Sequence, residues 1–406
     1  MSTRWIIGLA SGSSLSGVSA ALVEIEGTGL DLQVTPVRVV QQPYARELRD
    51  LIRYRESGES AESRQLCLLH RLLGETFAAA ARQAADRASL SLQRVQCIGC
   101  SGHTVRHEPD GRFPSTLSIG MPAIVAERTG VTTVSDFRSR DLAAGGQGAS
   151  IEALADYLLF RHAAETRVLL HLGASSGVVV LPAGGHLHQV LGFEIGPCTA
   201  LLDGLLRHFT AGKEEFDAGG KHGAQGCCIE PLLERWLNHP YFSRRPPKSL
   251  PRPTFADEFV QQGIQLARSQ SHGINDLVCT ATHLVARCIL TACRRFLGEY
   301  WPPDRVILSG GGTRNGLLWQ FLEQQFSPLP LEKTEQHGVP VEGRDAIASA
   351  VLTALTVDGV AGNRTLATGA SGSRLLGNLT PGSSANWARC LAWMAVQSAP
   401  LSVAHD

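Results

Sequence analysis

Three short segments rich in glycine and serine each follow an apolar run, and their composition suits them to binding phosphate. They are SGSSLSG (11–17), GASSG (173–177) and SGGG (309–312). Glycine lacks a Cβ atom, so backbone N–H groups can approach an anion there, and a helix after such a turn adds its positive end. One such turn is a weak indication, since most are ordinary turns. Three of them, placed in both halves of the chain, predict a nucleotide site.

The predicted contacts to this nucleotide come from the three turns and from residues just after them. A phosphate-binding hairpin in a kinase normally also carries a carboxylate for Mg²⁺, because this ion prefers oxygen ligands. The first turn has serines instead, so no metal-ligating residue is predicted. The expected nucleotide-binding residues are Gly12, Ser13, Ser14, Ser16, Gly17, Ser19, Gly173, Gly310, Gly311, Gly312 and Asn315.

Apolar periodicity predicts two α/β units that would position these turns. The first unit has a strand pair (6–25), a strand (32–44), a helix (62–88), a strand (94–102), a short strand and helix (117–130) and a buried strand (131–137). The second has a strand pair (167–182), a further strand (186–196), helices (199–209, 229–237, 257–269 and 275–300), a strand from Arg305 and a helix (315–326). Both units open with strand, turn and strand, which indicates a duplicated fold.

The chain of 406 residues is too long for one typical core, so we expect two domains. The first is predicted at 1–133 and is completed by the C-terminal segment 365–406, and the second is predicted at 134–364. The C-terminal segment carries Trp387 and Trp393 in an apolar sequence. It is expected either to dock on the protein as a helix or to bind a partner.

Composition argues against several classes of protein. The 37 basic and 37 acidic residues balance, which argues against affinity for a nucleic-acid backbone. No apolar run reaches the roughly 18 residues that span a membrane, and the first apolar run is too short for a signal peptide. We therefore expect a cytoplasmic protein that binds neither nucleic acid nor membrane.

The cysteines and histidines do not show the spacing of a metal site. Cys97 and Cys100 form a C-x-x-C within an apolar strand, but no second pair follows at zinc spacing. Buried reduced thiols are the simpler interpretation for most of the ten cysteines. His186 and His188 would share one face of the strand expected at 186–196, where metal ligation is again the weaker interpretation.

Longer segments around these motifs resemble the anhydro-N-acetylmuramic acid kinase family, over essentially the whole chain. They are SGSSLSGVSAALVE (11–24), GHTVRHEP (102–109), LSIGMPAIVAERTGVTTVSDFRSRDLAAGGQGA (117–149), GFEIGP (192–197), HPYF (239–242), PPKS (246–249) and LSGGGTRNGLL (308–318). The resemblance implies two actin-like (ribonuclease H-like) α/β domains with a nucleotide and substrate cleft between them. It also implies ATP and Mg²⁺ as cofactors, an anhydro amino sugar as substrate, and a homodimer.

The reaction implied by the resemblance is the opening of the 1,6-anhydro bond of a cell-wall sugar by water and transfer of the γ-phosphate of ATP to the released O6. By the same resemblance Glu194 stands where the family has its catalytic aspartate. The residues expected to contact the sugar are His103, Thr104, Arg138 and Asp141. Asp136 and Arg140 lie in the same segment, and these charged residues could equally form structural ion pairs.

Several polar positions of the family pattern are substituted in this chain. Aspartates are replaced by Ser16 and Ser19, a histidine by Ser101, an asparagine by His171 and a glutamate by Ala348. A glutamate in place of the catalytic aspartate shifts the carboxylate by about 1 Å, which can cost on the order of 10²-fold in rate. Asp217 and Asp345 are candidates for compensating carboxylates, and Lys248 could reach a phosphate or be a solvated loop residue. Two hypotheses follow: a weakened kinase, or a pseudokinase that binds nucleotide or sugar in a regulatory role.

Overall fold

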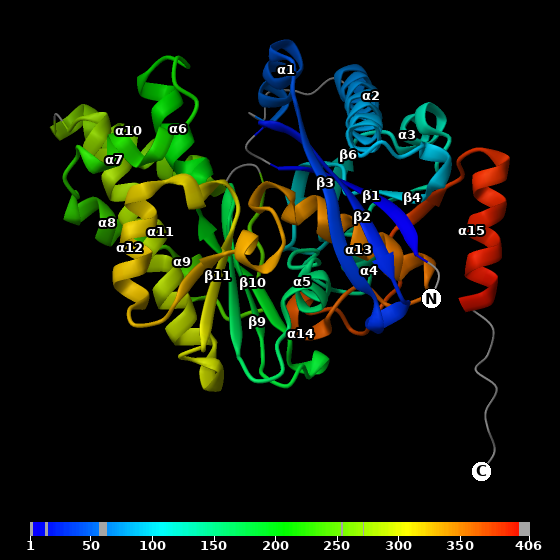
Figure 1. Cartoon of the computed structure of the whole chain (residues 1–406). Coiled ribbons are helices and arrows are strands. Elements are labelled where there is room, and N and C mark those ends of the chain that lie inside the picture. The colour runs from blue at the N-terminus through cyan, green and yellow to red at the C-terminus, as the bar shows by residue number, and fades with distance from the viewer. Residues whose placement is uncertain (1–2, 13–14, 57–62, 253–254, 271, 398–406) are drawn as a thin grey trace.

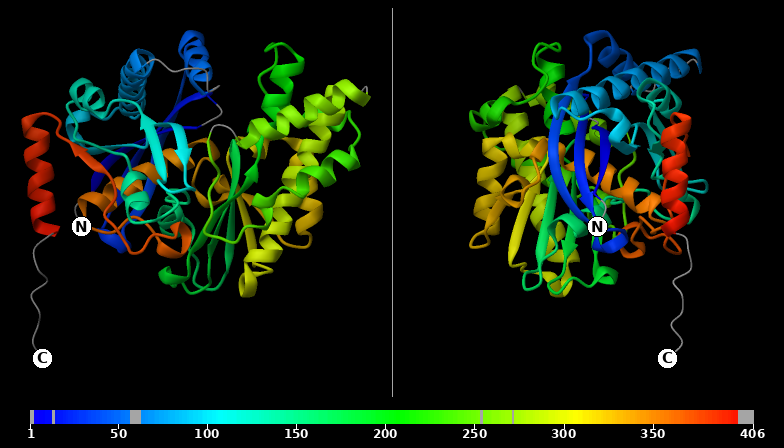
Figure 2. Two further views of the ribbon diagram at one scale, coloured as in Figure 1. Left: turned by 180° about the vertical axis from the view of Figure 1, so that it is seen from behind. Right: turned by 45° about the vertical axis from the view of Figure 1, so that its right-hand side comes forward.

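Two lobes, each built on a twisted β-sheet, lie side by side with a helical layer between the sheets (Figure 1). The computed structural model describes residues 3–12, 15–56, 63–252, 255–270 and 272–397. Ser13 and Ser14 of the first turn lie outside the described residues. The views in Figure 2 show the same two-lobed arrangement from behind and from the side.

The first sheet surrounds the strand pair that carries the first glycine–serine turn. β1 and β2 pair antiparallel on either side of this turn, and β3 pairs antiparallel with β2. β4 runs parallel to β1, and β7 runs parallel to β4. The strands in spatial order are β13 (Asn378–Thr380), β7 (Thr133–Ser135), β4 (Val95–Cys100), β1 (Arg4–Ser11), β2 (Gly17–Glu26) and β3 (Gln33–Pro43).

The second sheet repeats this topology. Its strands in spatial order are β10 (Leu191–Pro197), β9 (Ser175–Leu181), β8 (Arg167–Leu172), β11 (Arg305–Ser309) and β12 (Leu331–Lys333). The first three strands are antiparallel neighbours, and β11 and β12 run parallel to β8. Apart from the edge strand β13, both sheets therefore have the order 3-2-1-4-5 with the same directions. This repeated topology is the actin-like, ribonuclease H-like fold, and it confirms the predicted duplication.

Helices cover both faces of each sheet. α2 (Ser63–Arg87) packs its apolar face on the outer face of the first sheet. α13 (Arg344–Val357) and α5 (Ala153–Phe160) fill the space between the two sheets and form one core with residues of both. The outer face of the second sheet is covered by α6 (Thr199–Phe209), α10 (Phe255–Gln270), α11 (Ile274–Phe296) and α12 (Gly316–Phe326).

Two glycines allow α13 to pack directly on the first sheet. A Cβ atom at Gly8 of β1 would lie 1.8 Å from the carbonyl oxygen of Ala346. A Cβ atom at Gly99 of β4 would lie 2.1 Å from Oγ1 of Thr353. Real Cβ atoms do not approach so closely, so glycine at both positions lets the helix backbone touch the strands.

The C-terminal segment completes the first lobe. β13 pairs antiparallel with β7, and α15 (Ser384–Gln397) packs beside it. Asn386 of α15 accepts hydrogen bonds from the backbone N–H (2.7 Å) and the hydroxyl (2.6 Å) of Thr132 and donates one to the carbonyl oxygen of Val95 (3.2 Å). Trp393 donates from Nε1 to Asp358 (2.9 Å). The expected docking of this segment on the protein is therefore confirmed.

The predicted division at residues 133 and 134 stays a prediction, although two elements bear on it. β7 spans this boundary and belongs to the first sheet. α13 lies within the predicted second domain, yet it packs on β1, β2 and β4 of the first sheet.

Contacts across the two lobes join a small hairpin and a surface helix to the second lobe. The hairpin is formed by β5 (His103–Glu108) and β6 (Ser115–Ile119). Backbone hydrogen bonds link His107 of β5 to Arg252 of the second lobe, and Arg244 donates to Asp110 after β5 (2.6 Å). Arg53 of α1 (Arg46–Glu56) donates to Glu215 (3.1 Å). Of these residues, Arg252 also lines the cleft described below.

Some local predictions were wrong. His186 precedes a 3₁₀ turn, Leu187–Gln189, and His188 lies within it, because the preceding Gly184 and Gly185 adopt positive φ and delay the strand to Leu191. β5 was not predicted, whereas the short strand predicted within 117–130 overlaps β6. Most cysteines are buried and all are reduced, although Cys67 and Cys227 are exposed.

Among the described helices, α11 is long and apolar enough to cross a membrane, and most of it is buried in the second lobe. The remaining helices are α3 (Pro122–Thr129), α4 (Ser139–Ala143), α7 (Lys221–Ala224), α8 (Glu230–Leu237), α9 (Pro240–Ser243) and α14 (Thr365–Thr368).

Candidate functional site

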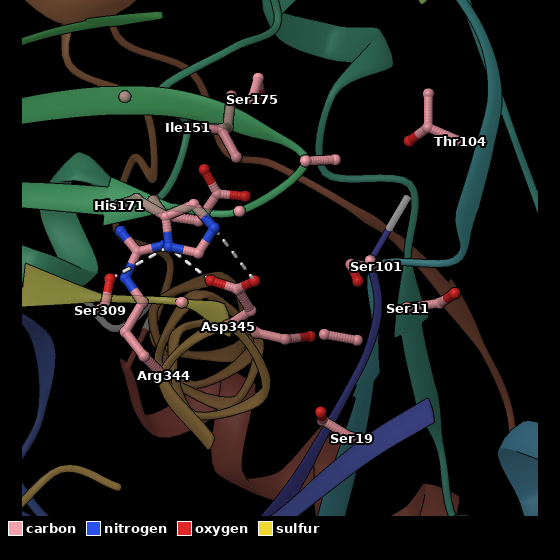
Figure 3. A pocket seen from close by; sticks show the side chains of 18 of the residues that line it. Ser11, Ser19, Ser101, Thr104, Ile151, His171, Ser175, Ser309, Arg344 and Asp345 are labelled. Atoms are coloured by element: carbon pink, nitrogen blue, oxygen red, sulfur yellow. Dashed lines mark hydrogen bonds and ion pairs between the residues drawn. The ribbon is translucent and has the colours of Figure 1, made fainter. Parts of the chain in front are cut away.

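A cleft of about 440 Å³ lies between the two lobes. Its walls include the tips of the β1–β2 and β8–β9 hairpins, the end of β11 and the N-terminal turn of α13. Figure 3 shows Ser11, Ser19 and Ser101 of the first lobe across from His171 and Ser309 of the second. The structure thus brings together the three glycine- and serine-rich segments, which lie far apart in the sequence.

Most of the predicted nucleotide-binding residues line this cleft, and two do not. Gly312 packs against Leu172, where a Cβ atom would lie 2.8 Å from that side chain. Asn315 caps α12, since its side chain accepts a hydrogen bond from the backbone N–H of Leu318 (3.0 Å). Neither residue lines the cleft, and their predicted contact with the nucleotide stays a prediction. The residues that line it are Gly12, Ser16, Gly17, Ser19, Gly173, Gly310 and Gly311.

The turn after β11 has the geometry that a close approach to a ligand requires. Gly310 adopts φ +87°, which side chains rarely tolerate, and a Cβ atom there would lie 2.6 Å from the carbonyl oxygen of Leu172. Gly311 lines the cleft with open space where its Cβ atom would be. The backbone at this turn is therefore accessible from the cleft.

Glu194 of β10 lines the cleft and is held by donors on both carboxylate oxygens. Oε1 accepts hydrogen bonds from Arg252 (2.6 Å) and from the hydroxyl of Ser175 (3.1 Å). Oε2 accepts one from the backbone N–H of Leu250 (2.6 Å), and the Glu194 carbonyl accepts one from the hydroxyl of Tyr241 (2.8 Å). The side chain is therefore fixed in one position.

The same contacts reduce the strength of Glu194 as a base. Burial alone would raise its pKa, but the charge of Arg252 and the Leu250 N–H outweigh burial and lower the pKa below its ordinary value. A general base works best when its pKa lies near the pH of the reaction. Glu194 is therefore a weak proton acceptor in this arrangement.

A second group of charges surrounds the N-terminal turn of α13 (Figure 3). Arg344 donates from Nε to buried Asp156 (2.9 Å) and from Nη1 to Asp345 (2.8 Å). His171 lies within 3.8 Å of Asp345, and its Nδ1 is 3.0 Å from the hydroxyl of Ser309. Although burial opposes it, the charges of His171 and Arg344 lower the pKa of Asp345 to about 2. Asp345 is thus the one of the two proposed compensating carboxylates that faces the cleft.

Three of the four residues expected to contact the sugar line the cleft. His103 is almost fully buried, with Nδ1 3.0 Å from the hydroxyl of Ser11, and Thr104 is hydrogen-bonded to Ser118 (3.0 Å). Arg138 donates to the carbonyl oxygen of Gly148 (2.6 Å) and lies 3.6 Å from Glu152. The fourth residue, Asp141, does not line the cleft.

Asp141 and two other positions singled out in the sequence, Asp217 and Ala348, have structural roles instead. Asp141 is fully buried and accepts hydrogen bonds from Gly148 (2.9 Å) and Asn363 (2.7 Å), so it holds two loops together. Asp217 accepts from the backbone N–H groups of His222 and Gly223 and does not line the cleft. Ala348 is fully buried in the core between the sheets.

Lys248 is neither a phosphate ligand nor a solvated loop residue. It is 1% exposed, donates to the carbonyl oxygen of Tyr241 (3.1 Å), and its Nζ lies 4.5 Å from the Tyr241 ring and 5.1 Å from the Phe296 ring. Burial lowers its pKa to about 8. The two expectations for Lys248 were therefore wrong, because neither considered a lysine enclosed by aromatic rings.

The sequence interpretation missed the residues that neutralise the cleft carboxylates. Arg252 and Arg344 are the principal ones, and each lies close in sequence to a candidate residue named above. Arg252 is four residues after Lys248, and Arg344 directly precedes Asp345. A basic residue beside a candidate carboxylate was the available signal, although pairing depends on the tertiary structure.

The cleft residues do not fit a protein-bound Mg²⁺. Among the described residues, five of the six cleft carboxylates are already paired with an arginine, and Asp136 accepts hydrogen bonds from Ser139 of α4 (2.7 Å). In the same part of the chain, no three acidic, histidine or cysteine side chains converge as a metal site would require. The six carboxylates are Asp136, Glu152, Asp156, Glu194, Glu342 and Asp345.

The fold and the cleft together define a two-lobed protein of the actin-like class, with glycine- and serine-rich tips and a fixed carboxylate facing one cleft. The sequence model of one family, anhydro-N-acetylmuramic acid kinase, matches residues 4–382. The chain belongs to this family.

Named relatives agree along nearly their whole length. The anhydro-N-acetylmuramic acid kinase of Gloeobacter violaceus is 38% identical over 92% of this chain and 98% of its own length. That of Caldanaerobacter subterraneus is 34% identical over 93% of this chain and 97% of its own. Among solved structures, a ROK family glucokinase from Streptomyces griseus in complex with glucose and AMPPNP aligns with 86% of this chain and 98% of its own. Its TM-score of 0.35 and identity of 13% are too low to transfer a function.

Proposed function

We propose that the protein binds ATP and 1,6-anhydro-N-acetylmuramic acid, or a closely similar anhydro amino sugar, in this cleft and phosphorylates the sugar slowly. The observation that carries the proposal is the position of Glu194, a carboxylate fixed in the cleft wall where the family has its catalytic aspartate. Membership of a kinase family supports both substrates.

In this proposal, Glu194 takes a proton from water and the water oxygen bonds to C1 of the sugar. The C1–O6 bond breaks, and O6 attacks the γ-phosphorus of ATP, which releases ADP. The arginines that lower the pKa of Glu194 reduce its capacity to accept the proton, so chemistry is slow. Backbone N–H groups at Gly310 and Gly311 and cleft hydroxyls are placed to contact phosphate oxygens.

A second candidate function is favoured by one specific observation: every cleft carboxylate of the described chain is already engaged. In that case the protein is a pseudokinase that binds the sugar or the nucleotide and acts as a regulator, without turnover. The same cleft would serve both functions, and they differ in whether Glu194 performs chemistry.

The deciding experiment measures ADP and 6-phosphosugar formed from ATP and 1,6-anhydro-N-acetylmuramic acid by purified protein. The matched control is Glu194→Gln, which keeps the shape of the side chain and removes its basicity. We expect slow turnover that falls at least tenfold in the control. Equal rates in the two proteins would refute the kinase and leave the binding protein.

Glu194→Asp provides a second arm, because it restores the shorter family side chain. A glutamate at Ala348 is not included, since that position is fully buried and would receive a carboxylate in the core. The cytoplasmic location and the homodimer belong to the same proposal. Cell fractionation and sedimentation velocity would test them.

A further inference from the structure

We infer that this protein binds a nucleoside triphosphate without a divalent cation. In this inference His171 contacts the phosphates at the place where the family is expected to use a metal. The inference rests on the nucleotide binding proposed above and specifies its chemistry. It concerns the charges and hydrogen-bond donors of the phosphate end of the cleft.

The first step is that every carboxylate lining the cleft in the described part of the chain already has a partner and is not available for a metal. Mg²⁺ needs near-octahedral oxygen ligands and is usually anchored by one or two carboxylates. Here the carboxylates nearest the N-terminus of α13 are shared between Arg344 and His171, and Glu194 is paired with Arg252. Releasing any of them would leave an arginine or histidine charge without its partner, at a cost that a metal would have to offset.

The second step is that two of the residues replacing family carboxylates, Ser16 and Ser19, carry hydroxyl donors and line the cleft. Hydroxyl groups and backbone N–H groups donate hydrogen bonds to phosphate oxygens, which accept only. Ser19 stands where the family has an aspartate, and its hydroxyl donates to Gln41 (2.8 Å) and can turn toward a ligand. The serines that line the cleft are Ser11, Ser16, Ser19, Ser101, Ser118, Ser150, Ser175, Ser309 and Ser349. A donor-rich wall of this kind suits the anion itself.

The third step is the position of His171. It is the penultimate residue of β8, two residues before Gly173, and its ring lies between Ser309 at the end of β11 and Asp345 at the start of α13 (Figure 3). Its Nε2 lies so close to Gly173 that a Cβ atom there would be 2.6 Å away. His171 therefore sits between two of the three glycine-rich tips, and its side chain is 30% exposed to the cleft.

Arg344, the cation at this point, is committed to two carboxylates. His171 keeps Nε2 3.8 Å from Asp345, a looser contact than a hydrogen bond. An entering phosphate oxygen can therefore accept a hydrogen bond from Nε2–H of the ring without breaking a close pair. His171 then supplies a hydrogen-bond donor to the phosphates at the place where the family is expected to use Mg²⁺.

The test is titration calorimetry with AMP-PNP, a non-hydrolysable ATP analogue, in buffer with EDTA and in buffer with MgCl₂. We expect dissociation constants within about threefold of each other for the natural chain. His171→Asn should weaken binding about 10- to 100-fold in both buffers, as for loss of a charge-assisted hydrogen bond.

A second variant, Ser16→Asp with Ser19→Asp, places carboxylates at the first tip. It should bind at least tenfold more weakly in EDTA and recover in MgCl₂, because only a metal can bridge these carboxylates to phosphate. The matched control is Ser373→Asp, an exposed serine outside the cleft, which should change neither value. Thermal unfolding of each variant shows whether it is folded.

The outcomes separate this inference from the proposed function. If the natural chain binds AMP-PNP at least tenfold more tightly in MgCl₂ than in EDTA, the inference is overturned and the kinase proposal still stands. Equal binding by His171→Asn would also overturn it. Absence of binding in both buffers would refute the nucleotide binding on which both rest.

Discussion

Replacing Arg252 by methionine would remove the cation that neutralises Glu194 while keeping most of the side-chain volume. The two side chains are 25% and 11% exposed, and Nη2 lies 2.6 Å from Oε1. Breaking a fully buried pair costs about 3–5 kcal/mol, because one charge remains buried without its partner. Arg252 is partly exposed, and Ser175 and Leu250 still donate to the carboxylate, so we expect a loss of about 2–3 kcal/mol at pH 7.

For a lobe of this size, such a loss lowers the midpoint of thermal unfolding by about 4–12 °C. Its pH dependence follows from the pKa of Glu194. In the folded natural protein this pKa is lowered, and in the unfolded chain a glutamate carboxyl has a pKa of about 4.3. The ion pair therefore stabilises the fold fully above the unfolded pKa. This stabilisation is lost as the pH falls through the folded pKa. In Arg252→Met the opposing effect of burial remains and raises the pKa. The difference between the two proteins should therefore shrink below 1 kcal/mol, roughly, near pH 4.

The assay is thermal or urea unfolding at pH 7 and pH 4 for both proteins, repeated in the Glu194→Gln background. In that background the buried charge is absent, so Arg252→Met should cost less than about 1 kcal/mol. The reasoning is refuted if Arg252→Met costs the same in both backgrounds, or if its cost is unchanged at pH 4.

Three further predictions concern other residues. Burial lowers the pKa of Lys248 to about 8, so the protein takes up a proton when it unfolds between pH 8 and about 10.4. The free energy of unfolding of the natural protein should therefore rise over this pH range. Urea unfolding of Lys248→Met should show no such rise. Burial raises the pKa of Asp203 on α6 to about 7, so the stability of the natural protein should fall as the pH rises from about 4 to 7. Asp203→Asn should therefore unfold at a higher temperature than the natural protein at pH 8. Below pH 4 the two unfolding temperatures should not differ in this way. Asn315→Ala should cost about 1 kcal/mol through loss of the α12 cap, while calorimetry with AMP-PNP shows an unchanged affinity; a tenfold weaker affinity would return Asn315 to the nucleotide site.

The fold class and many elements could be predicted because local patterns determine them, but α5 and α13, which form the layer between the two sheets, were not predicted. Strand pairs around glycine–serine turns and long amphipathic helices appear in the sequence with their correct periods, and α2 and α6 lie where they were expected. β5 was missed because it alternates polar and apolar residues only briefly. The 3₁₀ turn at 187–189 was missed because His186 and His188 imitate the period of a strand.

The candidate site was predictable only in outline. The glycine-rich tips could be recognised because their function depends on local backbone freedom, and they do meet at one cleft. Asp141 and Lys248 were assigned from their charge, yet both are buried among partners that are distant in sequence. The pairing of Glu194 with Arg252 likewise depends on how two segments approach in space, which residue type and spacing do not determine.

The position of α13 also has a consequence for how the protein is made. The first sheet is complete up to β7 at Ser135, but its inner face is covered by a helix that begins at Arg344. Roughly 200 residues are translated between these points, which takes about 10–40 s at 5–20 residues per second. During that interval the nascent chain exposes the apolar inner face of the first sheet. This protein should therefore depend on chaperones that bind nascent chains until the ribosome has delivered α13.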